Sequence, residues 1–285
     1  MTRRGPRPGA KALVTGGGGA IAREVAGRLA RVGYRLVLLD RNGEAMAATA
    51  AALPGGAETE VVDLGTAEGI RAACAVVEER HGDVDLLVNT AGVVEPGDVV
   101  DLDPVWLDLH INVNLLAAMQ LTRSAARLMR PRGRGDVVTI ISMGAIAPMP
   151  GSAAYAASKA GLRGFQISLR AELAPLGIRV MGVLPSGVDT PMLRNEALNG
   201  GTALNFLSEP LTAGQVADAV LRALRTGRLE TYLPYSDSLT SRAVLSIPWL
   251  AQPLLPRLEW FGERGRRKYL RDRGLVGGQE PGGAD

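Results

Sequence analysis

Four consecutive glycines, at positions 16–19, lie between a short apolar run and a helical pattern near the start of the chain. Residues 12–15 have the length of a buried strand, and helical spacing begins at Ala20 and Ile21 and continues to about residue 32. A strand, a glycine turn and a helix in this order are typical of the turn that binds the pyrophosphate of a dinucleotide. The glycines let the backbone approach the phosphates closely, and the N-terminus of the helix attracts the anion.

The glycine turn fits two patterns of dinucleotide-binding folds. Gly17, Gly19 and Ala22 match the general Gly-x-Gly-x-x-Gly/Ala fingerprint. A second frame begins at Thr15 and Gly16 and has alanines at positions 20 and 22. A P-loop is excluded, because no Gly-Lys-Ser/Thr sequence follows the glycines.

Apolar runs of strand length alternate with helical patterns through most of the remaining chain. Strands are expected at residues 35–39, 58–62, 84–88, 136–141, 178–184 and 229–233, and helices at about 43–52, 66–80, 104–130, 153–174 and 213–225. Alternating strands and helices form a parallel sheet with helices on both faces. The predicted fold class is therefore α/β, with a Rossmann-type doubly wound parallel sheet of about seven strands in one domain at residues 11–235.

An acidic residue, Asp40, follows the second predicted strand, about twenty residues beyond the glycines. A carboxylate at this place accepts hydrogen bonds from the adenosine ribose and repels a 2′-phosphate, so NAD is favoured over NADP. The next residue, Arg41, could pair with a phosphate, which keeps NADP as an alternative. Asp40 could instead be an N-cap or a turn residue.

The composition limits the other chemistries that this chain can support. A single cysteine, Cys74, allows no disulfide within the chain and no thiolate metal site, which suits a reducing cytoplasm. Only two histidines, His81 and His110, are present, so no metal site and no histidine-based triad are expected. A formal net charge of +3 is too small to imply nucleic acid binding.

One stretch places three polar groups where they could act on a single oxygen atom. Ser142 follows an apolar run, and Tyr155 and Lys159 are four residues apart, so they share one face of a helix. A phenol has an ordinary pKa of about 10, and the neighbouring ammonium is expected to lower it toward the range of a general acid or base. Ser142 would hydrogen-bond the substrate oxygen. The alternative is a half-exposed pair on a helix, because a Tyr-x-x-x-Lys spacing alone is not specific.

Together these motifs resemble the classical short-chain dehydrogenase/reductase family over residues 11–235. The resemblance rests on their order: TGGGGAIA from position 15, Asp40, Asp63, NTAG at 89–92, Asn114, Ser142, YAASK at 155–159 and PSGVDT at 185–190. It implies that Tyr155 is the catalytic acid/base, that Lys159 holds the nicotinamide ribose and lowers the tyrosine pKa, and that Ser142 orients the substrate oxygen. It also implies that Asn114, rather than Asn112, bends the long helix and positions a water of a proton relay.

The resemblance and the carboxyl ends of the predicted strands, where ligands of α/β sheets bind, define the expected cofactor residues. Asp63, Asn89 and Thr190 would contact the cofactor or support the sheet. Ala20, Ala22 and Ser186 replace glycines that are usual in the family. The expected cofactor residues are Gly16, Gly18, Gly19, Ala20, Ile21, Asp40, Arg41, Asp63, Leu64, Asn89, Ala91, Gly92, Tyr155, Lys159, Pro185, Gly187, Val188 and Thr190.

Residues 190–212 occupy the position where the family carries its substrate loop, and they are mostly apolar. Met192, Leu193 and Phe206 are therefore expected to bind the substrate together with Ser142. This pattern favours a bulky hydrophobic ketone or secondary alcohol. The alternative is that these side chains only pack the loop against the protein.

The two ends of the chain lie outside the region of resemblance. Residues 236–276 are expected to form a helical extension, whose prolines exclude a straight membrane-spanning helix. The extension could cover the substrate cleft, form an oligomer contact or make a peripheral membrane contact; the first two are favoured. Residues 1–10 are expected to be a disordered arm and residues 277–285 a loose tail. A homodimer or homotetramer is usual in the family.

The sequence thus predicts an NAD(P)-dependent oxidoreductase that interconverts a ketone and a secondary alcohol by hydride transfer, with Tyr155 as general acid/base. A rival from another class is a dinucleotide-binding regulatory or scaffold protein without turnover. The presence of Asn114, Ser142, Tyr155 and Lys159 favours the enzyme, because a binding protein does not need all four. A second rival is an epimerase or dehydratase that uses the same tyrosine and lysine.

Overall fold

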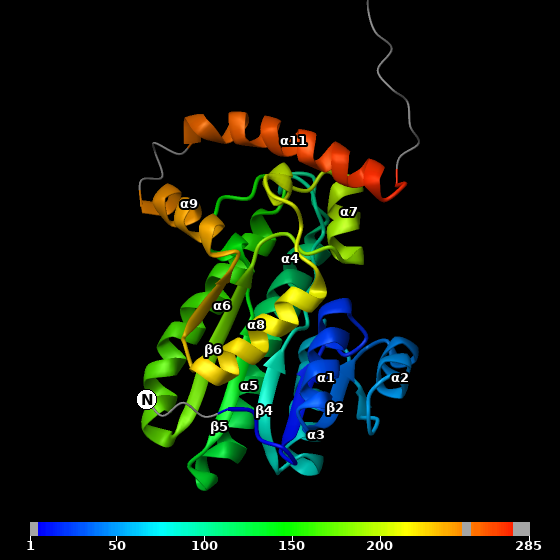
Figure 1. The fold of residues 1–285 in the computed structure, drawn as a ribbon, viewed down its shortest axis with the longest axis vertical. Coiled ribbons are helices and arrows are strands. Elements are labelled where there is room, and N and C mark those ends of the chain that lie inside the picture. The colour runs from blue at the N-terminus through cyan, green and yellow to red at the C-terminus, as the bar shows by residue number, and fades with distance from the viewer. Residues whose placement is uncertain (1–4, 247–251, 276–285) are drawn as a thin grey trace, which may run out of the picture.

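The computed structural model describes residues 5–246 and 252–275, and its centre is a parallel sheet of seven strands (Figure 1). The strand order is β3-β2-β1-β4-β5-β6-β7; all strands are parallel, and the order in which they are added reverses between β1 and β4. This arrangement confirms the predicted Rossmann-type fold class. The strands are β1 (Lys11–Thr15), β2 (Arg35–Asp40), β3 (Glu58–Val61), β4 (Val84–Asn89), β5 (Gly135–Ile140), β6 (Ile178–Pro185) and β7 (Glu230–Leu233).

Helices cover both faces of the sheet, because successive side chains of a strand point to opposite faces. Ala12 and Val14 of β1 share a buried cluster with α1 and α8, whereas Leu13 shares one with α3 and α5. The helices are α1 (Ala20–Arg31), α2 (Gly43–Ala51), α3 (Ala67–Arg80), α4 (Pro104–Ile111), α5 (Ala117–Met129), α6 (Ala153–Leu173), α7 (Pro191–Asn199), α8 (Ala213–Thr226), α9 (Tyr235–Ser246) and α11 (Leu255–Asp272).

The long helix expected at residues 104–130 is divided by a π-helical turn, Asn112–Leu116, between α4 and α5. Such a turn widens the helix by one residue and is frequent at functional sites. The sequence places Pro131 directly after this expected helix, as its stop. In the structure, Pro131 lies inside a short 3-10 turn, Arg130–Arg132, and Gly133 ends that turn with a left-handed φ of 58°.

Residues 5–10, which the sequence predicted to be part of a disordered arm, make contacts with the sheet in the structure. The Arg7 guanidinium lies 3.3 Å from Asp85 and 3.2 Å from Asp136, at the amino ends of β4 and β5. Asp136 is 2% exposed and also pairs with Arg179 at 2.6 Å. A buried carboxylate is costly without partners, which gives a physical reason for residues 5–10 to be held against the sheet.

The C-terminal extension is helical, as expected, in the parts that the structure describes. Helix α11 lies across the molecule beyond the carboxyl ends of the strands (Figure 1). It packs on the 3-10 turn Ala203–Phe206 and on α7, so the cleft-covering interpretation agrees with its contacts. Within residues 5–246 and 252–275, no helix combines the length and the apolar character needed to cross a bilayer. The expected loose tail at residues 277–285 lies outside the described residues.

Two glycines let α11 approach the turn beneath it closely. A Cβ at Gly262 would lie 2.1 Å from the Ala203 carbonyl oxygen, and a Cβ at Gly265 would lie 2.0 Å from the Phe206 carbonyl oxygen. Neither contact is possible for a side chain. Glu259 fixes the same turn, because its carboxylate accepts hydrogen bonds from the Thr202 hydroxyl at 2.5 Å and the Ala203 amide at 2.9 Å.

Gly262→Ala and Gly265→Ala should therefore each lower the free energy of unfolding by about 1–3 kcal/mol, as overpacking does. The matched control is Gly164→Ala in α6, where a Cβ meets nothing within 4 Å. This control should be neutral or stabilising by up to about 1 kcal/mol, because alanine is the better helix former. Urea unfolding measures all three variants, and equal effects at the three positions would contradict the tight docking of α11.

Candidate active site

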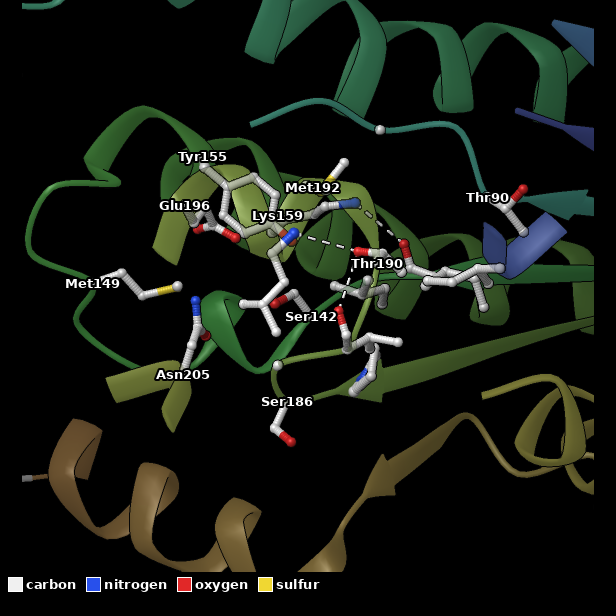
Figure 2. Close-up of a pocket in the computed structure, with 18 residues that line it drawn as sticks. Thr90, Ser142, Met149, Tyr155, Lys159, Ser186, Thr190, Met192, Glu196 and Asn205 are labelled. Carbon is white, nitrogen blue, oxygen red and sulfur yellow. Dashed lines mark hydrogen bonds between the residues drawn. The ribbon is translucent and has the colours of Figure 1, made fainter. Parts of the chain in front are cut away.

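The three polar residues singled out in the sequence lie in one pocket at the carboxyl edge of the sheet (Figure 2). Ser142 lies two residues beyond the end of β5, and its hydroxyl accepts a hydrogen bond from the Gly144 amide at 3.0 Å. Tyr155 and Lys159 come from the first two turns of α6. The structure therefore brings the serine, the phenol and the ammonium together, although a loop separates Ser142 from α6 in the sequence.

Lys159 is buried and carries no carboxylate partner among the described residues. The residue is 4% exposed, and Nζ donates a hydrogen bond to the Ile140 carbonyl oxygen at 3.3 Å. Nζ also lies 5.7 Å from the centre of the Tyr155 ring. Burial lowers the pKa of Lys159 to about 8, so most of the side chain is still charged at neutral pH.

The expected lowering of the Tyr155 pKa is wrong for the protein by itself. Burial raises the pKa of Tyr155 above its ordinary value, a hydrogen bond with Ser142 opposes this rise, and the charge of Glu196 adds to it. The loss of water around the phenolate raises the pKa more than the Lys159 ammonium, more than 5 Å from the ring centre, can lower it. The phenol is therefore protonated at neutral pH.

Asn114 joins three segments around the pocket from its place in the π-helical turn. Its Oδ1 accepts a hydrogen bond from the Val93 amide at 2.8 Å, and its Nδ2 donates to the Val93 carbonyl at 3.0 Å and to the Ser158 hydroxyl at 3.1 Å. Asn114 is 1% exposed. Asn112, the alternative, donates instead to the Gly65 carbonyl at 2.9 Å, so it is a packed polar group.

His110 lies beside this group, which the sequence did not indicate. Its ring is 6.4 Å from the Tyr155 ring, edge to face. Its Nδ1 lies 2.5 Å from the Trp106 carbonyl, and its Nε2 lies 3.2 Å from the Glu95 amide, so Nδ1 carries the proton and Nε2 accepts. Burial lowers the pKa of His110. The ring is thus a neutral packing partner of the tyrosine.

A second pocket, at the ends of β1, β2 and β3, suits an adenosine. It is lined by Gly16, Asp40, Arg41, Asp63, Leu64, Ala91 and Gly92, all of which the sequence predicted, and by Val62, Trp106, Leu109 and Val113 among others. The Asp40 carboxylate accepts hydrogen bonds from the Gly18 amide at 2.9 Å and the Asn42 amide at 2.8 Å. These bonds hold Asp40 at the rim of the glycine turn.

The glycine turn fits a dinucleotide pyrophosphate. A Cβ at Gly18 would lie 2.9 Å from the Ala45 side chain and 3.4 Å from Asp40, so this position needs glycine. Gly19 is the N-cap of α1, and no side chain caps the first amides of that helix. Uncapped amides at a helix N-terminus are a ready site for an anion.

The remaining predicted cofactor residues divide between the pocket and the sheet. Ile21, Pro185, Gly187, Val188 and Thr190 line the reaction pocket with Tyr155 and Lys159. Asn89 lies elsewhere: it is 4% exposed, and its side chain donates a hydrogen bond to the Thr122 hydroxyl at 3.1 Å. Of the two roles left open for Asn89, support of the sheet agrees with this position.

A larger apolar cavity of about 240 Å³ adjoins the reaction pocket and shares Ser142, Met149, Ser186 and Asn205 with it. Its other walls come from the turn near residue 204 and from the C-terminal extension, including Leu204, Leu207, Leu255 and Leu258. The sequence analysis did not identify Leu255 and Leu258, because no local pattern marks residues outside positions 11–235 that fold back onto the site.

The predicted substrate residues are only partly in place. Met192 and Leu193 line the reaction pocket. Phe206 does not line either cavity. It is 4% exposed, and its ring packs 5.1 Å from the ring of Tyr269 on α11. The expectation for Phe206 is therefore corrected: this side chain anchors the C-terminal helix.

Asp189 links that helix to the loop that follows β6. Its carboxylate accepts hydrogen bonds from the Tyr269 hydroxyl at 2.6 Å, from Arg273 at 2.8 Å and 2.9 Å, and from Arg194 at 3.2 Å. Burial alone would raise the pKa of Asp189, but the hydrogen bonds from Arg273 and Tyr269 lower it below its ordinary value. We call these hydrogen bonds of Asp189 with Tyr269, Arg273 and Arg194 the Asp189 clamp. Because the neighbouring residues Val188 and Thr190 line the reaction pocket, the clamp helps to shape that pocket.

No metal centre competes with this site in the part of the chain that the structure describes. Within those residues, no group of three or more histidine, cysteine, aspartate or glutamate side chains is arranged to hold an ion.

A parallel sheet with a nucleotide groove and a reaction pocket at its carboxyl edge defines the class of Rossmann-type dinucleotide-binding proteins. The sequence profile of the short chain dehydrogenase family matches residues 10–199. The chain therefore belongs to the short chain dehydrogenase family, whose members are oxidoreductases that use NAD(P).

Three relatives illustrate the range of the family. The chain is 32% identical to estradiol 17-beta-dehydrogenase 11 of Mus musculus over 80% of this chain and 76% of that protein. The bulky-bulky ketone specific alcohol dehydrogenase from Comamonas testosteroni has a similar structure, with a TM-score of 0.70 and 25% identity over 85% of this chain and 94% of that one. A short-chain dehydrogenase from Sphingobium yanoikuyae, solved in complex with NADPH, has a TM-score of 0.72 and 26% identity over 97% of this chain and 99% of that one.

The clamp on Asp189 can be tested by unfolding. Asp189→Asn should lower the free energy of unfolding at neutral pH by about 1 kcal/mol, because it weakens charge-assisted hydrogen bonds. The control Asp218→Asn, whose side chain is 61% exposed in its pair with Arg28, should cost less.

The effect of Asp189→Asn should also depend on pH. A folded pKa below the ordinary value of about 3.9 means that the stabilisation is complete above that pH and is lost as the pH falls through the folded pKa. The difference between wild type and variant should therefore shrink under acid conditions. A difference that grows on acidification would contradict the clamp.

Proposed function

We propose that this protein interconverts a ketone and a secondary alcohol on a bulky hydrophobic substrate, with NAD as the preferred cofactor and Tyr155 as general acid/base. The observation that carries the proposal is the shared pocket of Ser142, Tyr155 and Lys159 at the carboxyl edge of a Rossmann-type sheet. These three groups are suited to one oxygen atom, which they can hold, protonate and deprotonate.

In the direction of reduction, Ser142 and Tyr155 bind the carbonyl oxygen of the substrate. The raised pKa of Tyr155 keeps its proton in place until negative charge develops on that oxygen. Bound NAD(P) supplies the hydride donor or acceptor of the family. In the direction of oxidation, Tyr155 removes the alcohol proton, and the charged Lys159 stabilises the phenolate.

In the proposed mechanism, protons pass between Tyr155 and bulk water by way of Lys159 and a water held at Asn114. A Cβ at Gly92 would lie 3.3 Å from the Asn114 side-chain oxygen and 3.6 Å from Lys159 Nζ, so these two groups face the same small space. Both Nδ2 protons of Asn114 are donated to protein groups, whereas Oδ1 accepts one bond, from the Val93 amide, so in its proposed role Oδ1 would also accept a bond from a proton-carrying water there.

The cofactor would be held along the groove that runs from Asp40 to Thr190. Asp40, at the rim of the adenosine pocket, supports the preference for NAD, because its charge repels a 2′-phosphate. Arg41 is exposed beside it, which keeps NADP as the alternative. The NADPH-bound neighbour from Sphingobium yanoikuyae is the comparison that favours this alternative.

The apolar cavity beside the pocket supports a bulky substrate. Leucines from two separate segments, Leu204 and Leu207 of the substrate loop and Leu255 and Leu258 of the extension, line it. The names of the estradiol dehydrogenase and of the bulky ketone dehydrogenase agree with such a substrate. A cytoplasmic homodimer or homotetramer remains our proposal for the assembly.

The rival, a dinucleotide-binding protein without turnover, predicts no dependence on the phenol. Under our proposal, Tyr155→Phe should lower kcat by about 10²–10⁴-fold, because it removes the acid/base and leaves the packing nearly intact. Its cofactor affinity should stay close to that of the wild type. Lys159→Ala should damage both kcat and cofactor affinity. Turnover is followed as nicotinamide absorbance with a panel of bulky ketones, and affinity by fluorescence titration.

The control for the loss of a buried phenol is Tyr34→Phe. Tyr34 is 5% exposed and accepts a hydrogen bond from the Arg7 amide at 3.2 Å, far from the reaction pocket. This variant should retain wild-type kcat. Equal activity of wild type and Tyr155→Phe would remove the proposed acid/base.

The cofactor preference is tested with Asp40→Ser. The wild type should bind NADH more tightly than NADPH, and the variant should shift the ratio of the two dissociation constants toward NADPH by about 10-fold, since an unfavourable charge contact disappears. Glu44→Gln, an exposed acid at the start of α2, is the control for a general change of charge and should leave the ratio unchanged. A ratio that is insensitive to Asp40→Ser would contradict the proposed preference.

A further inference from the structure

One acidic side chain in the reaction pocket has no role in the proposed mechanism. Glu196 lies on α7, is 6% exposed and lines the pocket with Ser142 and Tyr155. Figure 2 shows its carboxylate beside the Tyr155 ring. The carboxyl oxygens are not fully enclosed, so they can be reached from the pocket, and a carboxylate that has lost most of its hydration gains from a polar partner there.

None of the described residues supplies that partner. Desolvation is the one influence on the Glu196 carboxyl, with no hydrogen bond or charge to offset it. The nearby arginines are engaged elsewhere: Arg194 pairs with Asp189 at 3.2 Å, and Arg266 binds the Gly201 carbonyl at 3.2 Å and Glu263 at 2.6 Å. Packing alone does not explain the carboxyl either, because an apolar side chain of the same size would fill the space at lower cost.

We infer that Glu196 recognises a hydroxyl group of the substrate close to its reacting carbon, so that the substrate is a bulky hydroxyketone or the corresponding diol. This inference rests on the proposed function of the same pocket and narrows its substrate class. The reacting oxygen of the substrate would be bound by Ser142 and Tyr155. The rest of the substrate would occupy the apolar cavity with Leu204, Leu255 and Leu258. The hydroxyl would face α7.

A hydroxyl group suits this carboxyl in both of its protonation states. Burial raises the pKa of Glu196 to about 7, so both protonation states are populated near neutral pH. A hydroxyl donates to the carboxylate and accepts from the neutral acid, and it is therefore a partner in either state. A methyl group at the same place would leave the buried carboxyl unpaired, and a site of this kind discriminates strongly against such an analogue.

The test compares ketones that differ only in this group. One pair is benzoin and its analogue with a methyl group in place of the hydroxyl. The other is the β-hydroxyketone formed from acetophenone and benzaldehyde, with its methyl analogue. The wild type should show a kcat/KM at least about 10-fold higher for the hydroxylated member of one pair. Because the charge of Glu196 also acts on Tyr155, the readout is the kcat/KM ratio within a pair: Glu196→Leu should abolish the preference for the hydroxylated member, and Glu196→Gln should restore part of it.

Two controls separate recognition from a structural role. Glu209→Gln changes an exposed acid of the same loop and should keep the wild-type preference. Thermal unfolding of Glu196→Leu should show an unchanged or higher Tm, because no partner is lost. Equal kcat/KM within both pairs for the wild type, or a preference that survives in Glu196→Leu, would overturn the inference.

Failure of the proposed function gives a different result. If the wild type reduces none of the four ketones with NADH or NADPH, the oxidoreductase assignment to bulky ketones fails. Calorimetric titration of the same pairs into the protein with NADH then still tests Glu196. Tighter binding of a hydroxylated member that is lost in Glu196→Leu supports the recognition, and equal binding within each pair overturns it.

Discussion

The buried amide of Asn114 is the interaction on which the reaction pocket depends most directly. It pairs with both backbone groups of Val93 beyond β4 and with Ser158, the residue before Lys159. The edge of the sheet, the long helix and α6 are thereby joined at one point. The π-helical turn that carries Asn114 departs from regular α-helical geometry, and such turns are frequent at functional sites. The position of Lys159 follows from this junction.

Burial sets the electrostatics of the pocket more than pairwise charge does. It lowers the pKa of Lys159 to about 8, raises that of Glu196 to about 7 and raises that of Tyr155. Each ionisable group is thus moved toward its neutral form, as expected when water is removed. A pocket of this kind holds a phenol proton ready for transfer and leaves a carboxyl that gains from a polar group of a ligand.

The C-terminal extension completes the site from outside the family core. Gly262 and Gly265 allow α11 to lie directly on the turn at residues 203–206, and Asp189 ties the helix to the loop after β6. The same extension supplies Leu255 and Leu258 to the apolar cavity. Cavity shape and loop position therefore depend on one packed helix, which connects substrate selection to the stability of the C-terminal segment.

Local pattern was sufficient for the Rossmann-type fold and for the meeting of Ser142, Tyr155 and Lys159. Strands, glycine turn and helical faces depend on near neighbours, and parallel strands bring their carboxyl ends to one edge. Other features were decided by segments far apart in the chain. The pKa of Tyr155 is raised and not lowered. The Phe206 side chain packs against α11, and Glu196 lines the reaction pocket without a hydrogen-bond partner among the described residues. Burial is the physical reason, because the water that a side chain loses depends on which distant elements pack over it, and only the tertiary structure determines that.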